Sequence, residues 1–164
     1  MVTNFHELYQ HYAQDVYRFA YWLCGDAQDA EDITSETFVR ALTATGEIKV
    51  DTVKGYLLTI AKNLAFKKSN QGKRFTSLSP NLRTALDGPE KVAETNLNWQ
   101  SAMRFMQSLP AIDRAALLMH VEDELSYEEI AAALGISLSA TKVRIHRARM
   151  KLAAYRLQQE ELSS

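Results

Sequence analysis

The sequence predicts an all-α protein made of two small helical domains joined by a flexible linker, with a helix-turn-helix in the C-terminal domain. Apolar residues recur at steps of three and four along most of the 164 residues, which is the period of an amphipathic helix. No segment alternates apolar and polar residues with the β-branched enrichment of a strand. Between residues 69 and 94 the helical period fails and Gly, Pro, Ser and Asn accumulate, which is typical of a connecting segment.

The first part of the chain predicts three helices. One apolar stripe runs through residues 5–23 and indicates a long amphipathic helix. Asp26 has the position of an N-cap for a second helix, which we expect to end near residue 44. Asp51 has the same position before a third helix, whose apolar stripe covers residues 53–64. The inward-facing residues expected in the second helix are Ala30, Ile33, Phe38, Ala41 and Leu42.

The irregular stretch divides the chain into an N-terminal domain at residues 1–72, a linker at 73–95 and a C-terminal domain at 96–158. A segment of this length is too long for a loop inside one compact domain. Helices resume near residue 89. Pro110 suits the first turn of a helix that we expect to end near Val121.

The C-terminal domain carries a helix-turn-helix pattern. Ser126 and Glu129 have the spacing of a capping box, and Gly135 is suited to the left-handed turn that ends a helix. Ser137 can cap the longer basic helix that follows. A short helix, a turn containing Gly and a longer helix are the elements of a DNA-binding helix-turn-helix.

The second helix of this motif has one apolar and one polar face. At 100° per residue, its buried stripe contains Leu138, Thr141, Ile145, Ala148, Leu152 and Tyr155. The opposite face holds Ser139, Val143, His146 and Arg147, with Lys142 and Arg144 on its two sides. Small and hydrogen-bonding residues can reach base edges, and flanking cations can reach phosphates. The alternative is an exposed helix with local ion pairs, but residues 130–159 contain no acid that could form them.

The net charge of −1, from 19 basic and 20 acidic residues, hides two basic blocks. Residues 52–86 contain seven basic residues and no acid, and residues 130–159 contain six basic residues and no acid. Two such blocks favour two contacts with a polyanion, most simply nucleic acid, over two solvated helix faces.

Several classes of protein are excluded by composition. The apolar run at residues 19–24 is too short to span a membrane, and residues 1–7 lack the pattern of a signal peptide. One cysteine, Cys24, precludes an internal disulfide, and we expect it to be a buried structural thiol in a cytoplasmic protein. The four His residues have no metal-ligand spacing, and no phosphate loop is present. We therefore expect no catalytic residue, metal or cofactor, and a protein that is not an enzyme.

Five segments together resemble the extracytoplasmic-function group of the sigma-70 family. Residues 109–114 (Leu-Pro-Ala-Ile-Asp-Arg), 125–131 (Leu-Ser-Tyr-Glu-Glu-Ile-Ala) and 142–149 (Lys-Val-Arg-Ile-His-Arg-Ala-Arg) resemble region 4. Residues 29–41 are similar to region 2.2, and residues 56–63 resemble the start of region 2.4. The resemblance covers both domains in the family's order.

The resemblance implies a sigma factor that binds core RNA polymerase at its beta-prime clamp and beta flap and starts transcription at promoters. The implied polymerase contacts are Asp29, Asp32, Glu36 and Phe38. The implied contacts with −10 DNA are Lys54, Lys62, Asn63, Lys67 and Lys68, and residues 43–52 correspond to the family's pocket for a flipped base. The implied contacts with −35 DNA are Ser139, Lys142, Val143, Arg144, His146 and Arg147. An anti-sigma factor is a further implied partner, and any membrane contact would pass through it.

Two other functions remain open from the sequence. A helix-turn-helix regulator without polymerase affinity would share the C-terminal motif, but it would not need the acidic segment at residues 29–41. A sigma mimic that acts in anti-sigma partner switching would have little reason to keep Arg144, Arg147 and Arg149. Salt-dependent binding to DNA would separate the mimic from the other two.

Overall fold

The computed structural model describes residues 5–43, 52–70 and 89–163, and within these ranges it contains seven α-helices and no β-strand. The all-α prediction is therefore confirmed. Residues 5–70 are called the N-terminal half below, and residues 89–163 the C-terminal half. No helix in the described ranges is long and apolar enough to cross a membrane.

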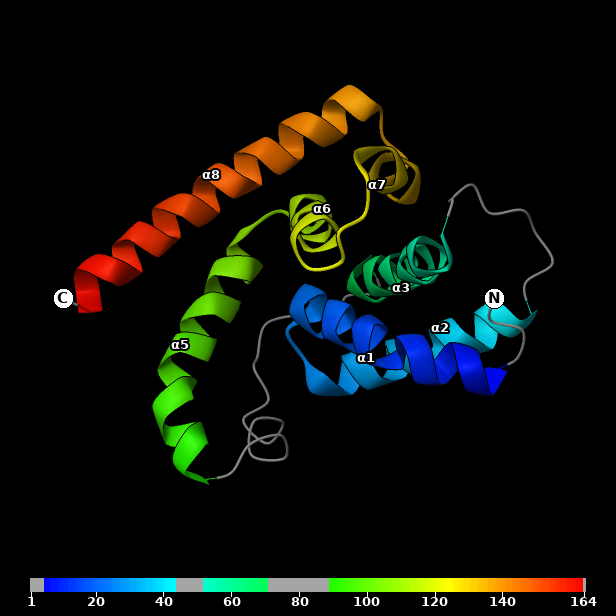
Figure 1. The fold of residues 1–164 in the computed structure, drawn as a ribbon, viewed down its shortest axis with the longest axis horizontal. Helices are drawn as coiled ribbons and strands as arrows, with labels where there is room; N and C mark the ends of the chain where they lie inside the picture. Colours follow the sequence, from blue (N-terminus) through cyan, green and yellow to red (C-terminus); the bar gives the residue numbers. More distant parts are fainter. Residues whose placement is uncertain (1–4, 44–51, 71–88, 164) are drawn as a thin grey trace.

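The N-terminal half is a bundle of α1 (Phe5–Cys24), α2 (Ala27–Thr43) and α3 (Val53–Asn70), as Figure 1 shows. The Asp26 carboxylate accepts a hydrogen bond of 2.9 Å from the backbone N–H of Asp29, which confirms Asp26 as the cap of α2. Asp51 lies outside the described residues. Its neighbour Thr52 accepts a hydrogen bond of 3.0 Å from the N–H of Gly55 and caps α3.

The C-terminal half contains the predicted helix-turn-helix in α6 (Ala111–Val121), α7 (Tyr127–Leu134) and α8 (Leu138–Ser163). The Ser126 hydroxyl accepts from the N–H of Glu129 at 3.1 Å, and the Glu129 carboxylate accepts from the N–H of Ser126 at 3.2 Å. Gly135 ends α7 at a φ of +68°, a value that favours glycine because it has no Cβ. The Ser137 hydroxyl caps α8 by accepting from the N–H of Ala140 at 3.0 Å.

Helix α5 (Pro89–Ser108) begins where the sequence indicated that helices resume, and so starts inside the predicted linker at 73–95. Residues 71–88 lie outside the described residues. The boundaries 1–72, 73–95 and 96–158 accordingly stay a prediction.

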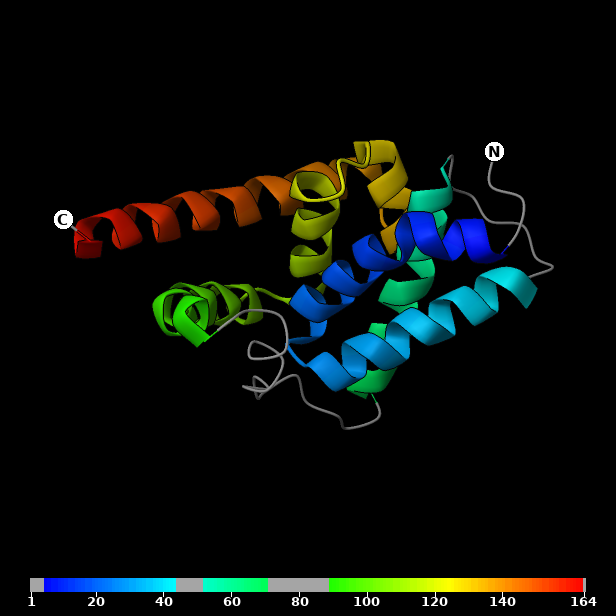
Figure 2. The same cartoon turned by 60° about the horizontal axis from the view of Figure 1, so that its bottom comes forward.

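The two halves pack against each other, with α6 and α7 lying over α1 and α3 (Figures 1 and 2). The rings of Trp22 in α1 and Trp99 in α5 are 4.8 Å apart between centroids. At the other end of the contact, the Thr52 hydroxyl donates a hydrogen bond of 2.6 Å to the carboxylate of Glu129. One continuous apolar core runs through both halves and buries Cys24, as predicted.

Candidate nucleic-acid interface

The outer face of α8 carries the side chains predicted to reach a DNA groove. Thr141, Ile145 and Ala148 are buried against the rest of the C-terminal half, which turns the opposite side of the helix outward. Leu138 is an exception to the predicted buried stripe, because it is exposed. The exposed members of the predicted −35 set are Ser139, Lys142, Val143, His146 and Arg147.

Arg144 differs from the other members of that set because it is half-buried and paired. Its Nη1 lies 2.7 Å from Oδ1 of Asp113 in the first turn of α6. The Nη2 of Arg147 lies 3.9 Å from Oδ2 of the same carboxylate. Helix α8 therefore does have an acidic partner, which lies outside residues 130–159 because Asp113 is 31 residues before Arg144.

Helix α3 exposes only part of the predicted −10 set. Asn63 and Lys67 are exposed. Lys62 is only 8% exposed, with its Nζ 2.5 Å from Oδ1 of Asn63 and 5.6 Å from the centre of the Phe66 ring. Burial lowers the pKa of Lys62, because water no longer stabilises the ammonium. In this arrangement the Lys62 side chain is mostly buried and its ammonium is bonded to Asn63.

The other two predicted −10 lysines are paired with acids of the same chain. Lys54 Nζ lies 3.5 Å from Asp15 in α1 and 3.7 Å from Asp123 in the C-terminal half. Lys68 Nζ lies 3.8 Å from Asp29 and 4.0 Å from Asp32 in α2. Part of the basic charge of α3 is therefore neutralised within the chain.

Asp123, which pairs with Lys54 where the two halves meet, has a strongly shifted pKa. Burial raises its pKa to about 6, although the neighbouring Lys54 ammonium acts in the opposite direction. In the same contact the hydrogen bond from Thr52 lowers the pKa of Glu129. The junction of α3 with α7 and the turn before it thus holds two carboxyl groups whose pKa values are shifted in opposite directions.

Helix α2 carries the predicted polymerase surface, but Phe38 is not part of it. Phe38 is 1% exposed, and its ring centroid lies 5.1 Å from that of Tyr9. The outward apolar residues of α2 are Val39, which is 55% exposed, and Leu42, which is 52% exposed and was expected to face inward. The predicted acids Asp32 and Glu36 are exposed beside them, Glu36 being paired with Arg40 at 3.0 Å; Asp29 is half-buried.

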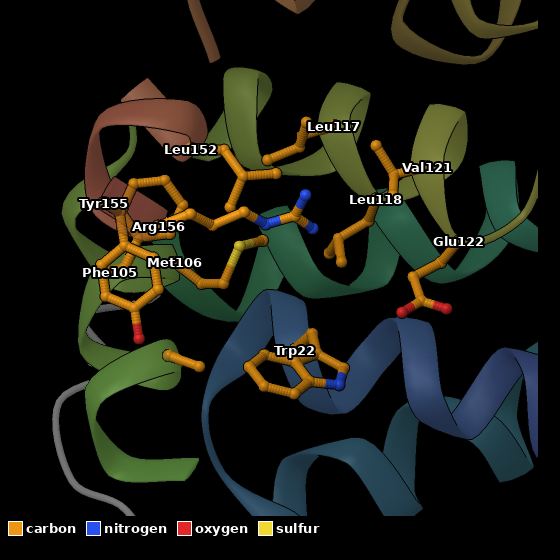
Figure 3. Close-up of a pocket in the computed structure, with 11 residues that line it drawn as sticks. Trp22, Phe105, Met106, Leu117, Leu118, Val121, Glu122, Leu152, Tyr155 and Arg156 are labelled. Atoms are coloured by element: carbon orange, nitrogen blue, oxygen red, sulfur yellow. The ribbon is translucent and has the colours of Figure 1, made fainter. Parts of the chain in front are cut away.

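Figure 3 shows a pocket of about 310 Å³ at the junction of the two halves. Trp22 of α1 forms one wall and belongs to the N-terminal half. The other walls come from α5, α6 and α8, and the long side chain of Arg156 extends between Leu152 and Met106 in this view. Because both halves contribute, the pocket has this form only while they are packed together.

The described residues contain no group of three His, Cys, Asp or Glu side chains able to hold a metal ion. Cys24 is buried and remains a thiol, since burial raises its pKa to about 12. The predicted base pocket at residues 43–52 falls largely on residues 44–51, which the structure does not describe.

Comparison with known proteins covers both halves. Residues 8–74 match the family model "Sigma-70 region 2", and residues 99–152 match "Sigma-70, region 4". The ECF RNA polymerase sigma factor SigM of Bacillus subtilis (strain 168) is 31% identical over 153 residues, which are 90% of this chain and 92% of SigM. The ECF RNA polymerase sigma factor SigE of Mycolicibacterium smegmatis is 32% identical over 159 residues, which are 94% of this chain but only 62% of SigE.

A solved structure has the same arrangement of helices. The sigma factor RpoE of Bartonella quintana, crystallised with the anti-sigma factor NepR, superposes with a TM-score of 0.71 at 20% sequence identity. The match covers 94% of this chain and 97% of that one. At 20% sequence identity, this similarity supports a shared fold and nothing more.

Proposed function

The chain belongs to the extracytoplasmic-function sigma factors of the sigma-70 family, and on this premise we propose that it binds core RNA polymerase and directs it to promoters with −10 and −35 elements. The observation that carries the proposal is that matches to region 2 and region 4 fall one on each half and in the family's order. In this role the protein acts by binding and not as an enzyme.

We assign recognition of the −35 element to the outer face of α8. Ser139, Val143 and His146 are small or hydrogen-bonding side chains on an exposed face, which suits contact with base edges. Lys142 and Arg147 supply exposed positive charge beside them, which suits contact with phosphates or guanine.

We assign recognition of the −10 element to α3, on which Asn63 and Lys67 are exposed. Lys54 can join them only after it leaves Asp123 of the C-terminal half, from which it is separated by 3.7 Å. We propose that −10 DNA competes with Asp123 for Lys54, and that α7 and the turn before it then move away from α3. The packed arrangement is thus a state that precedes promoter binding.

The polymerase surface that we propose is the outer face of α2. Its acids would repel DNA, so a protein partner with basic residues is the more suitable occupant. Val39 and Leu42 place two exposed apolar side chains next to Asp32 and Glu36, and apolar contacts surrounded by charge are typical of a protein interface.

We also propose an anti-sigma partner, which would hold the packed arrangement. The pocket at the junction takes walls from both halves, and a partner that binds only the packed state stabilises that state by mass action. The relative RpoE was crystallised with the anti-sigma factor NepR, which supports this class of partner. Membrane contact is proposed only through such a partner.

Run-off transcription tests the proposal. Sigma-free core RNA polymerase is given a pool of genomic fragments with and without this chain, and transcript starts are mapped. We expect new starts at a fixed distance from a shared pair of elements. Asp32→Lys should reduce these starts by weakening binding to the core, whereas Glu160→Lys, an equal charge change at an exposed position outside the proposed surfaces, should not.

The alternatives predict other outcomes. A regulator without polymerase affinity would bind duplex DNA but would not comigrate with the core enzyme. A mimic in partner switching would bind neither DNA nor core. If active core gives no new starts and does not comigrate with the chain, the promoter-directing role is wrong.

A further inference from the structure

Asp113 connects two arginines of the recognition helix to α6. It lies in the first turn of α6, where the helix dipole favours a carboxylate, and its side chain is almost completely buried. Its Oδ1 accepts a hydrogen bond of 2.7 Å from Arg144, and its Oδ2 lies 3.9 Å from Arg147. One carboxylate therefore faces two side chains spaced three residues apart on α8.

The two arginines are held to different extents. The contact with Arg144 is short and charge-assisted, and the Arg144 side chain is half-buried. If Arg144 left to bind a phosphate, a buried carboxylate would lose its main partner, which is costly. Arg147 is 57% exposed in its side chain and makes only the longer contact, so it can bind DNA while the carboxylate still orients it.

We propose that Asp113 is a positioning residue for −35 recognition, which holds Arg144 in an ion pair within the protein and aims the guanidinium of Arg147 at the DNA groove. The inference rests on the proposed function, because it concerns how the assigned face of α8 reads DNA. It removes Arg144 from the residues that contact DNA directly. It also gives Asp113 a role in specificity, since its pair with Arg144 keeps that arginine from binding phosphates of any sequence.

The experiment uses the full chain assembled with core RNA polymerase. A −35 duplex is first selected by the wild-type holoenzyme from a randomised pool, and affinities are then measured for each single-base variant of it. A contact between Arg147 and guanine gives about 5- to 150-fold discrimination at one position. We expect Asp113→Asn to reduce the discrimination at that position several-fold, and Asp113→Glu to retain more of it because the charge is kept.

A second readout separates positioning from a merely structural role. In Asp113→Asn both arginines are released and can reach phosphates. The slope of log K against log salt on a duplex without a −35 element should therefore become steeper by about 0.9 to 1.8. A loss of folding alone would weaken binding to every duplex and would not steepen this slope. Glu122→Gln also removes one negative charge, directly after the end of α6, and should leave the base discrimination and the salt slope unchanged.

Arg144→Gln keeps the inference testable if Asp113→Asn does not fold. Because Arg144 is assigned to the ion pair with Asp113 and not to DNA, this variant should lower the thermal midpoint but leave the salt slope unchanged. Arg147→Gln should make the slope shallower or abolish the base preference.

The inference is overturned if Arg144→Gln makes the salt slope shallower by about 0.9, because Arg144 then contacts a phosphate. It is also overturned if folded Asp113→Asn keeps both the wild-type preference and the wild-type slope. If the wild-type holoenzyme selects no shared −35 sequence at all, it is the proposed function that fails.

Discussion

The guanidinium of Arg114 lies 2.6 Å from the backbone oxygen of Leu23, and this contact ties α6 to the last turn of α1. Its Nε and Nη2 donate to the carbonyl oxygens of Met106 and Leu109 at 2.9 Å each, at the end of α5. These carbonyls form the negative ends of two helix dipoles, which compensates the buried charge even though burial lowers the pKa of Arg114. One side chain therefore fixes three helices and both halves.

Arg114→Met should lower the free energy of unfolding by about 3 kcal/mol, because it leaves three buried carbonyl groups without their donor. Arg114→Lys should retain part of this stability, since an ammonium can satisfy some of the acceptors but cannot fork. Urea unfolding followed by circular dichroism measures the change. Arg104→Met, at an exposed position of α5, is the matched control. A loss below about 0.5 kcal/mol for Arg114→Met, the range of ordinary surface changes, would contradict this role.

Asp123 gives the packed arrangement a specific dependence on pH. Its pKa is about 6 in the folded chain, against an ordinary value of 3.8, so between these values the folded state binds more protons than the unfolded state. Stability therefore falls as pH rises from 4 to 6. Asp123→Asn should be more stable than the wild type above pH 6, by up to about 3 kcal/mol, and equally stable below pH 4.

The measurement is urea unfolding of both chains at several values between pH 4 and 7.5. Only the difference between them is informative, because other carboxyl groups titrate in both. Glu124→Gln is an exposed neighbouring control and should show no such difference. If Lys54 stabilises the Asp123 carboxylate more than burial destabilises it, the wild type will instead be the more stable chain at pH 7.5, and this prediction is wrong.

The features that the sequence predicted correctly depend on neighbours within one or two helical turns. Asp26, Ser126 and Ser137 each accept a hydrogen bond from a backbone N–H three residues later, so a cap can be identified from local spacing alone. Gly135 likewise ends α7 through its own backbone angle. The period of the apolar residues gave the helices for the same reason.

The contacts that the sequence did not predict join residues far apart in the chain. Asp113 and Arg144 are 31 residues apart, and Thr52 and Glu129 are 77 apart. An absence of nearby acids therefore gave no information about pairing. Leu42 shows a related limit of prediction from sequence. A helical wheel identifies the apolar face of a helix, but it does not show how far along that face the neighbouring helices extend.

Phe38 and Val39 are adjacent in sequence, but their substitution should affect different properties. Replacing Phe38 should lower the stability, and replacing Val39 should weaken binding to core polymerase. Phe38→Ala should lower the free energy of unfolding by about 3–5 kcal/mol, the usual effect of removing a buried aromatic ring. Val39→Ala, on the exposed face, should change stability by less than about 0.5 kcal/mol and weaken binding to core polymerase. Urea unfolding and a core-binding titration measure the two effects. Unchanged core affinity in both Val39→Ala and Leu42→Ala would move the polymerase contact away from this face.

The two tryptophans of the chain report directly on the contact between the halves. Trp22 and Trp99 are its only tryptophans, and their rings meet across the junction at 4.8 Å between centroids. DNA contains no tryptophan, so emission changes on adding a promoter duplex arise from the protein. If binding of −10 DNA separates the halves, as we propose, both indoles become hydrated and the emission should shift to longer wavelength.

The expected shift should follow binding measured in parallel by anisotropy of a labelled duplex. Trp99→Phe leaves Trp22 as the single reporter and should show a shift in the same direction, because Trp22 also lines the pocket at the junction. A duplex with neither promoter element should produce a smaller shift at equal concentration, since weaker phosphate-dependent binding is also less able to displace Asp123. Saturated binding of the promoter duplex without any change in emission would mean that the halves stay packed on DNA, and the proposed separation would then be wrong.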